Sequence, residues 1–117
     1  MKRTVVVALT RAPYGRVHLP EGLRAAHGVA AGFDRHDVTV LFTEDSVYAA
    51  RDAADRDALD MDDHVDGLLE QDGDLAVDAE ALDNRGIAPE EVDDDVELLP
   101  EDRVAQLIDN ADHLLTF

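Results

Sequence analysis

Residues 74–87 read DLAVDAEALDNRGI, and this stretch decides the fold that the sequence predicts. Residues 74–77 predict a short strand, and residues 78–85 predict a helix that follows it at once. Gly86 stands where that helix is expected to stop. Parallel sheets are built from units in which a strand leads into a helix, and the residues on either side predict more of them.

On the N-terminal side, the run 4–9 is continuously apolar and rich in β-branched residues, which is typical of a strand covered on both faces. Residues 11–19 contain Pro13 and Gly15 and predict a loop. Pro20 and Glu21 predict the start of a helix. Residues 37–43 predict the second strand, and residues 44–50 a short helix.

On the C-terminal side, residues 60–71 have apolar side chains at helical spacing and predict a helix, whereas the polar segment 51–59 has no clear assignment. Residues 96–99 predict a fourth short strand after an acidic loop. A helix is expected from Pro100, with its core side formed by Val104, Leu107, Ile108 and Ala111, and residues 113–117 predict a last strand. The fold class is therefore α/β, with residues 1–117 forming a single domain whose open, mainly parallel sheet carries helices on both faces.

The composition is strongly acidic, with 28 Asp and Glu against 10 Lys and Arg and a formal net charge of −18. The acids alternate with apolar residues at helical or strand spacing, which indicates a folded domain rather than a disordered one. A DNA-mimicking or metal-buffering protein would also be acidic. The near absence of lysine, with Lys2 the one example, favours a third interpretation, adaptation to a salt-saturated cytoplasm.

The chain contains no cysteine, which excludes disulfides, iron–sulfur clusters, cysteine zinc sites and thiol chemistry on its own residues. The five histidines lack metal-ligand spacing, so no metal site and no cofactor is expected. Glycine-rich nucleotide-binding motifs do not occur. No apolar run has the length of a membrane span, and we expect a cytoplasmic protein.

Five short motifs occur in order along the chain, and together they resemble one protein family. They are 10–15 (TRAPYG), 21–23 (EGL), 42–48 (FTEDSVY), 79–86 (AEALDNRG) and the hydrophobic residues that end in Phe117. In this order and spacing they are similar to motifs of the DsrE/DsrF-like family, which includes the TusBCD sulfur-relay proteins, and most similar to its TusC (DsrF-like) branch.

The resemblance implies a DsrE-like fold and a role in sulfur relay, which feeds tRNA 2-thiouridine synthesis or a related pathway. The family's carriers place a cysteine where the helix after the third strand begins, and here Asp78 or a residue beside it holds that position. The resemblance therefore implies a non-catalytic accessory subunit, not an enzyme. Its expected partners are DsrE-fold homologues, one bearing the carrier cysteine, or further copies of the chain, with no direct nucleic-acid binding and no membrane.

A candidate site lies at the carboxyl ends of the strands, where ligands bind in open α/β sheets. The candidate contacts with a ligand or partner come from the loops after the first two strands: Arg11, Tyr14, Arg16, His18, Asp45 and Tyr48. Tyr14, Tyr48, Leu115 and Phe117 are candidates for partner contact, although Phe117 is also a candidate core residue.

Several alternatives remain open for this site. The arginines of the first loop could bind a carboxylate or phosphate, which would suit a homo-oligomeric protein with a small anionic or nucleotide-like ligand. They could equally belong to a solvated loop. Asp78 could cap the helix that follows it, whereas a role as general base would need a second catalytic group that the sequence does not identify.

Overall fold

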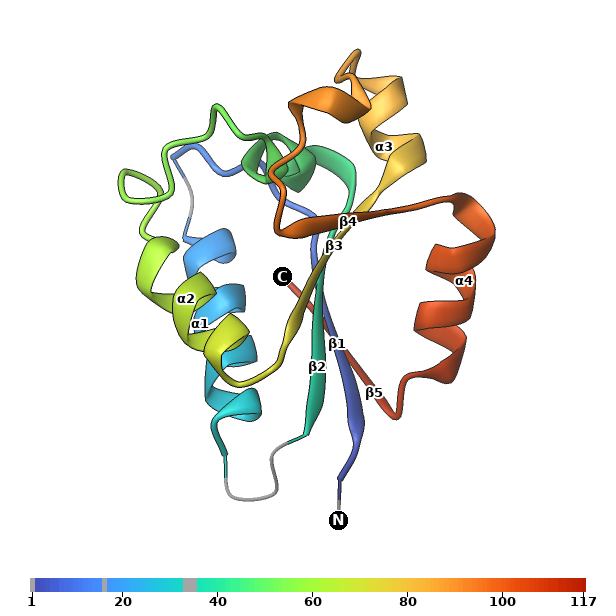
Figure 1. Cartoon of the computed structure of the whole chain (residues 1–117). Coiled ribbons are helices and arrows are strands. Elements are labelled where there is room, and N and C mark those ends of the chain that lie inside the picture. The colour runs from blue at the N-terminus through green and yellow to red at the C-terminus, as the bar shows by residue number, and fades with distance from the viewer. Residues whose placement is uncertain (1, 16, 33–35) are drawn as a thin grey trace.

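The structure is a computed structural model that describes residues 2–15, 17–32 and 36–117. Its elements are, in chain order, β1 (Thr4–Leu9), α1 (His18–Ala30), β2 (Asp37–Phe42), the 3₁₀ helix η1 (Glu44–Ala50), α2 (Asp62–Glu70), β3 (Asp74–Asp78), α3 (Ala79–Asn84), the 3₁₀ turn η2 (Pro89–Glu91), β4 (Val96–Leu99), α4 (Glu101–Asn110) and β5 (His113–Thr116) (Figure 1). The strands and helices alternate as the sequence predicts.

The five strands form one sheet in the order β4-β3-β2-β1-β5. Every neighbouring pair is parallel, and the register pairs Val5 with Val38 and Leu75 with Val96. The predicted fold class is confirmed, and the sheet is parallel throughout. Because all the strands run the same way, their carboxyl ends lie at the same end of the sheet, and β1, β2 and β3 run upward toward it in Figure 1.

The helices cover the two faces of the sheet unequally. Helices α1 and α2 lie side by side on one face, α4 lies alone on the other, and the short α3 lies beyond the carboxyl ends of the strands (Figure 1). In the described residues, no helix has the length and apolar character that crossing a membrane requires.

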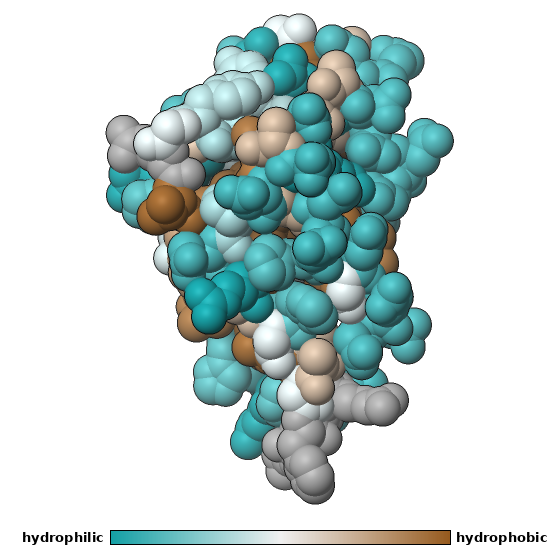
Figure 2. Space-filling view, turned by 90° about the vertical axis from the view of Figure 1, so that its left-hand side faces the viewer, coloured by the Kyte–Doolittle hydropathy of each residue, from teal (hydrophilic) through white to brown (hydrophobic). Residues whose placement is uncertain are grey.

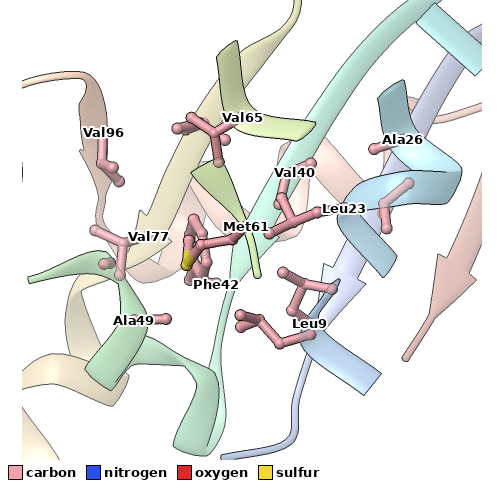
Figure 3. Packing of buried hydrophobic residues seen from close by; sticks show 14 of the residues in the cluster. Leu9, Leu23, Ala26, Val40, Phe42, Ala49, Met61, Val65, Val77 and Val96 are labelled. Carbon is pink, nitrogen blue, oxygen red and sulfur yellow. The ribbon is translucent and has the colours of Figure 1, made fainter. Parts of the chain in front are cut away.

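The larger core cluster lies between the sheet and the α1–α2 layer, and Figure 3 shows side chains of β1, β2, β3 and β4 meeting those of the helices there. A smaller cluster of Val6, Leu41, Ala76 and Leu99 lies under α4. The core is built mainly from aliphatic side chains, and Phe42 is the largest of those that are fully buried.

Helix α4 is only loosely buried. Val104, Leu107 and Ala111 pack against the smaller cluster as predicted, but Ile108 is 36% exposed, so its assignment to the core side is wrong. The reason is geometric, because a single helix presents one narrow stripe to the sheet and Ile108 lies at the margin of that stripe.

Strand β5 is the edge next to β1, and all four of its residues are exposed. Phe117 follows it and packs against the larger core cluster. A Cβ added at Gly22 of α1 would lie 3.1 Å from Cγ of Phe117 and would clash with Leu9, so the glycine lets the chain end approach α1 closely.

The helix boundaries differ slightly from expectation. Helix α1 begins at His18, so Pro20 falls inside its first turn, where its missing N–H costs no hydrogen bond. Helix α3 covers residues 79–84, with Asp78 as the last strand residue and N-cap. Gly86 follows with φ +69°, the left-handed conformation expected after a helix end.

Candidate functional site

Asp78 lies where β3 ends and α3 begins, and both of its carboxylate oxygens are hydrogen-bonded within the chain. Oδ1 accepts from the backbone N–H groups of Glu80 at 3.1 Å and Ala81 at 3.4 Å. Oδ2 accepts from the hydroxyl of Thr43 at 2.9 Å. The side chain therefore caps α3 and ties it to the end of β2.

Ser46 joins the ends of β1 and β2, and sequence reasoning did not single it out. Its buried hydroxyl accepts from the backbone N–H of Thr43 at 3.0 Å and lies within hydrogen-bond distance of the carbonyl oxygens of Leu9 and Thr43, to either of which it can donate. The signal that could have found it is Thr43-x-x-Ser46 directly after a strand, which is half of a capping box.

A groove of about 370 Å³ lies beside Asp78 and has a predominantly acidic lining. Its charged lining residues are Glu44, Asp78, Glu80 and Arg85. The guanidinium of Arg85 is already paired, because its Nε lies 3.0 Å from Oδ1 of Asp45 and Nη1 donates to the carbonyl of Ala81. This charge distribution disfavours an anion in the groove, and Asp45 acts here as a partner of Arg85.

The two tyrosines predicted as contacts are joined by Arg51. Nη2 of Arg51 donates to the hydroxyl of Tyr14 at 3.0 Å, and Nε donates to the carbonyl of Tyr48 at 2.9 Å. The guanidinium carbon lies 5.4 Å from the centroid of the Tyr48 ring, within range of a cation–π interaction. Tyr14 is 59% exposed, whereas Tyr48 is half-buried against the core.

A hollow of about 930 Å³ opens between the loop after β1 and the segment 51–60. Tyr14, Val17, His18, Arg51 and Leu59 are among the residues that line it. Nδ1 of His18 is buried and has no hydrogen-bond partner among the described residues.

Three of the six predicted contact residues lie at the hollow or at the groove. Tyr14 and His18 line the hollow, and Asp45 lies at the groove beside Asp78. Arg11 is exposed on the loop after β1, and no hydrogen bond to its side chain is seen among the described residues. The predicted contact at Arg16 lies outside the described residues.

The segment that forms the far wall of the hollow is held in place by Arg56. Its guanidinium forms a two-pronged ion pair with Asp95, at 2.8 and 2.7 Å, and also lies 3.2 Å from Asp93. The hydrogen bonds from Arg56 lower the pKa of Asp95, and the same carboxylate raises the pKa of Arg56. The hollow therefore has one wall anchored to the start of β4.

The surface around these features is mostly polar. Figure 2 views the molecule from the α1–α2 side, where teal hydrophilic residues cover most of the surface and brown hydrophobic ones appear as scattered spots. Across residues 2–15, 17–32 and 36–117, no group of three His, Asp or Glu side chains gathers closely enough to hold a metal ion.

Comparison with known proteins places this geometry in a family. No curated protein sequence matches the chain. The crystal structure of the ychN protein from E. coli matches with a TM-score of 0.81 and 26% sequence identity over 100% of both chains. Protein MTH1491 from Methanobacterium thermoautotrophicum shares the fold, with a TM-score of 0.65 and 14% identity over 93% of this chain and 90% of its own.

The model of the DsrE/DsrF-like family matches residues 3–117, which is nearly the whole chain. The resemblance that the five sequence motifs suggested is thereby confirmed at the level of the family. The chain belongs to the DsrE/DsrF-like family.

Proposed function

We propose that this protein is a non-carrier, TusC/DsrF-like subunit of a sulfur-relay complex. The observation that carries the proposal is the hydrogen bonding of Asp78, which by the sequence resemblance matches the family's carrier cysteine to within one residue. Its two carboxylate oxygens accept hydrogen bonds from Glu80, Ala81 and Thr43, so the residue serves the local fold.

Chemistry supports a non-carrier role at this position. A sulfur carrier needs a nucleophilic thiolate that can accept sulfane sulfur and release it again. A carboxylate offers neither a sulfur nucleophile nor a persulfide, and the chain has no cysteine elsewhere. The relay chemistry would therefore belong to a cysteine-bearing partner of the same family, from which sulfur passes toward tRNA 2-thiouridine synthesis or a related pathway.

The role of this chain would then be assembly, and its exposed apolar side chains favour strand β5 as the contact surface. Leu114 is 46% exposed and Leu115 is 39% exposed, and they project from opposite faces of a free sheet edge. Tyr14 is a further exposed candidate. Tyr48 and Phe117 pack against the core, which leaves less of either side chain for a partner.

Affinity isolation of the tagged full-length chain from its native host at high salt tests this role. We expect mass spectrometry to identify a small, cysteine-bearing DsrE-family chain in amounts comparable to the bait. Recovery of the bait without any such chain would contradict the heteromeric relay role.

A pair of variants tests the contact surface. The double variant Leu114→Thr/Leu115→Thr keeps high β propensity but removes apolar surface, and we expect it to lose the partner. Leu98→Thr is the matched control, because Leu98 is a 37% exposed leucine on β4, the opposite edge of the sheet. Equal recovery of the partner with both variants would exclude β5 as the contact.

A homo-oligomeric protein that binds a small anionic ligand is the second candidate. The acidic groove beside Asp78 does not favour it, but the hollow around Arg51 does. In the isolation experiment this candidate would give the chain associated only with itself.

A further inference from the structure

The hollow between the loop after β1 and residues 51–60 contains a partly buried, positively charged side chain that has no carboxylate partner among the described residues. We propose that this hollow binds a small ligand made of one carboxylate on an apolar body, with Arg51 as the group that receives the carboxylate. The proposal does not depend on the sulfur-relay role, because it concerns a cavity other than the groove beside Asp78.

Arg51 is held in position before any ligand arrives. Nε and Nη2 are fixed by the carbonyl of Tyr48 and the hydroxyl of Tyr14, and the guanidinium lies over the Tyr48 ring. These partners are neutral, so they orient the guanidinium without cancelling its charge. Pre-orientation lowers the entropic cost of binding, and arginine matches the planar geometry of a carboxylate.

Partial burial combined with the lack of a carboxylate partner distinguishes Arg51 from the other cations that the structure describes. In the part of the chain that the structure describes, Lys2, Arg24, Arg56 and Arg85 form ion pairs, whereas Arg51, Arg3, Arg11 and Arg103 form none, and the last three are exposed. Arg51 is nonetheless only partly exposed. A partly buried guanidinium with neutral partners favours an anionic group in the adjoining hollow.

The rest of the lining suits an apolar body. Prolines, alanines, a valine and a leucine form most of the wall: Pro13, Val17, Pro20, Ala53, Ala54, Ala58 and Leu59. Val17 is 69% exposed, so much of this apolar side chain is available for contact with a ligand. The volume of about 930 Å³ lies in the range of small-molecule sites, which combine apolar walls with a few fixed polar groups.

The start of α1 adds to the preference for one negative charge. Val17 is its N-cap and provides no side-chain hydrogen bond, and Glu21, the acid of the first turn, lies 3.7 Å from Arg24, so the positive end of the helix dipole at His18 is only partly offset. Asp55 and Asp60 also line the hollow, but Oδ1 of Asp55 accepts from the N–H of Ala58 at 3.1 Å. These two carboxylates restrict the anionic group to the side of the hollow near Arg51.

Three probes of the same shape and different charge test the proposal: phenylpropanoate, the neutral phenylpropanamide and the cationic phenylpropylamine. Titration of the purified full-length chain, followed by NMR, would be done in about 1 M salt, where repulsion by the acidic surface is screened within about 3 Å. We expect the carboxylate to bind most tightly and to shift the amide signals of residues 51–59. Equal or tighter binding of the amide or the amine would overturn the proposal.

Substitutions then locate the site. Arg51→Gln should weaken binding of phenylpropanoate about tenfold, because a charge-assisted hydrogen bond is lost. Arg103→Gln is its control, since Arg103 is an exposed arginine on α4. Ala58→Leu should block the hollow and abolish binding while Arg51 stays intact, whereas Ala105→Leu on α4 should leave binding unchanged. Unaltered affinity in both Arg51→Gln and Ala58→Leu would place the probe elsewhere and refute the site.

Discussion

The carboxylate of Asp78 accepts hydrogen bonds from two backbone N–H groups and one hydroxyl, so we expect its removal to destabilise the folded chain. Asp78→Ala should lower the free energy of unfolding by about 1 kcal/mol, the usual value of a helix N-cap. Asp78→Asn should change it much less, because asparagine caps a helix about as well as aspartate. Denaturant unfolding followed by circular dichroism measures both.

Asp83→Ala is the matched control for this prediction. Asp83 is an exposed aspartate later in the same helix, so its loss should leave stability nearly unchanged. If Asp78→Ala and Asp83→Ala unfold at the same denaturant concentration, Asp78 is not the cap that its geometry indicates.

The buried hydroxyl of Ser46 gives a second prediction at this scale. Ser46→Ala leaves the N–H of Thr43 without its acceptor at the joint between β1 and β2, and should cost about 1–3 kcal/mol. Thr116→Val is the control, since Thr116 is exposed on β5. Unfolding curves of Ser46→Ala and Thr116→Val that coincide would show that the buried bond adds nothing to stability.

Individual site residues were only partly predictable from the sequence. The capping role of Asp78 follows from local spacing and was one of the predicted alternatives. The link from Tyr14 through Arg51 to Tyr48 was not predictable, because residues 51–59 have no periodic pattern and because Arg51 meets Tyr14 only after the chain has folded. Contacts between residues distant in sequence leave no mark on local spacing.

At the scale of elements, the ion pair of Arg56 with Asp95 anchors the irregular segment 51–60 to the start of β4. Hydrogen bonds from Arg56 lower the pKa of Asp95 below its usual value of 3.8. As the pH falls, the unfolded chain therefore binds a proton at Asp95 at a higher pH than the folded chain does. The stability that Asp95 contributes is present above pH 3.8 and is lost as the pH falls through the lowered pKa.

We expect Asp95→Asn to be less stable than the parent chain at neutral pH, with a difference that shrinks as the solution is acidified. Thermal unfolding at a series of pH values measures that difference. Asp94→Asn, one residue away and exposed, should show a smaller loss of stability at neutral pH. A pH-independent loss in Asp95→Asn would mean that the carboxylate charge is not what holds the segment.

Asp74 at the start of β3 should behave in the opposite way. Desolvation raises its pKa, and the neighbouring charges of Glu97, Asp37 and Asp72 raise it further. As the pH rises, the folded chain keeps a proton on Asp74 up to a higher pH than the unfolded chain does. The contribution of Asp74 to stability therefore falls as the pH rises from 3.8 through the raised pKa.

Asp74→Asn removes that penalty and should raise the melting temperature at neutral pH, but not at a pH below 3.8. Asp66→Asn on α2 removes the same charge from an exposed position and serves as the control. If Asp66→Asn stabilises the chain as much as Asp74→Asn, the effect comes from net charge and not from the surroundings of Asp74.

Most elements could be predicted because their patterns are local. The run of β-branched residues in β1 and the strand–helix junction at Asp78 specify their conformations directly. Ile108 was misassigned because periodicity identifies the apolar face of a helix but not how much of that face is buried. The buried width depends on how many other elements pack against the helix. Within the part of the chain that the structure describes, helix α4 has no neighbouring helix on its side of the sheet (Figure 1).

At the scale of the whole molecule, the parallel sheet could be predicted from alternating strands and helices, but the strand order could not. The order places β5 beside β1, at the edge, which leaves Leu114 and Leu115 exposed. Sequence patterns show where strands occur along the chain, whereas the order of the strands in the sheet depends on how the helical connections between them pack. The surface that we propose for assembly is therefore a result of topology.

The net charge of −18 leads to the prediction that belongs to the molecule as a whole. Carboxylates on one compact surface repel one another, and this repulsion is screened at about 1 M salt, where the Debye length is about 3 Å, but much less below about 0.1 M, where it reaches about 10 Å. We propose that the chain is adapted to molar salt, and we expect its melting temperature to fall steeply as salt is lowered across this range.

A variant with fewer surface charges separates screening from other effects of salt. It would carry amides in place of six exposed carboxylates that form no ion pair among the described residues: Asp52, Asp66, Glu70, Asp83, Asp94 and Asp109. If self-repulsion is the cause, this variant should melt at a higher temperature than the parent in low salt and lose less stability on dilution. Scanning calorimetry across the salt series measures both melting temperatures. A parent melting temperature that does not change with salt would contradict the adaptation. An equal fall in parent and variant would mean that the loss of stability comes from salt effects other than charge screening.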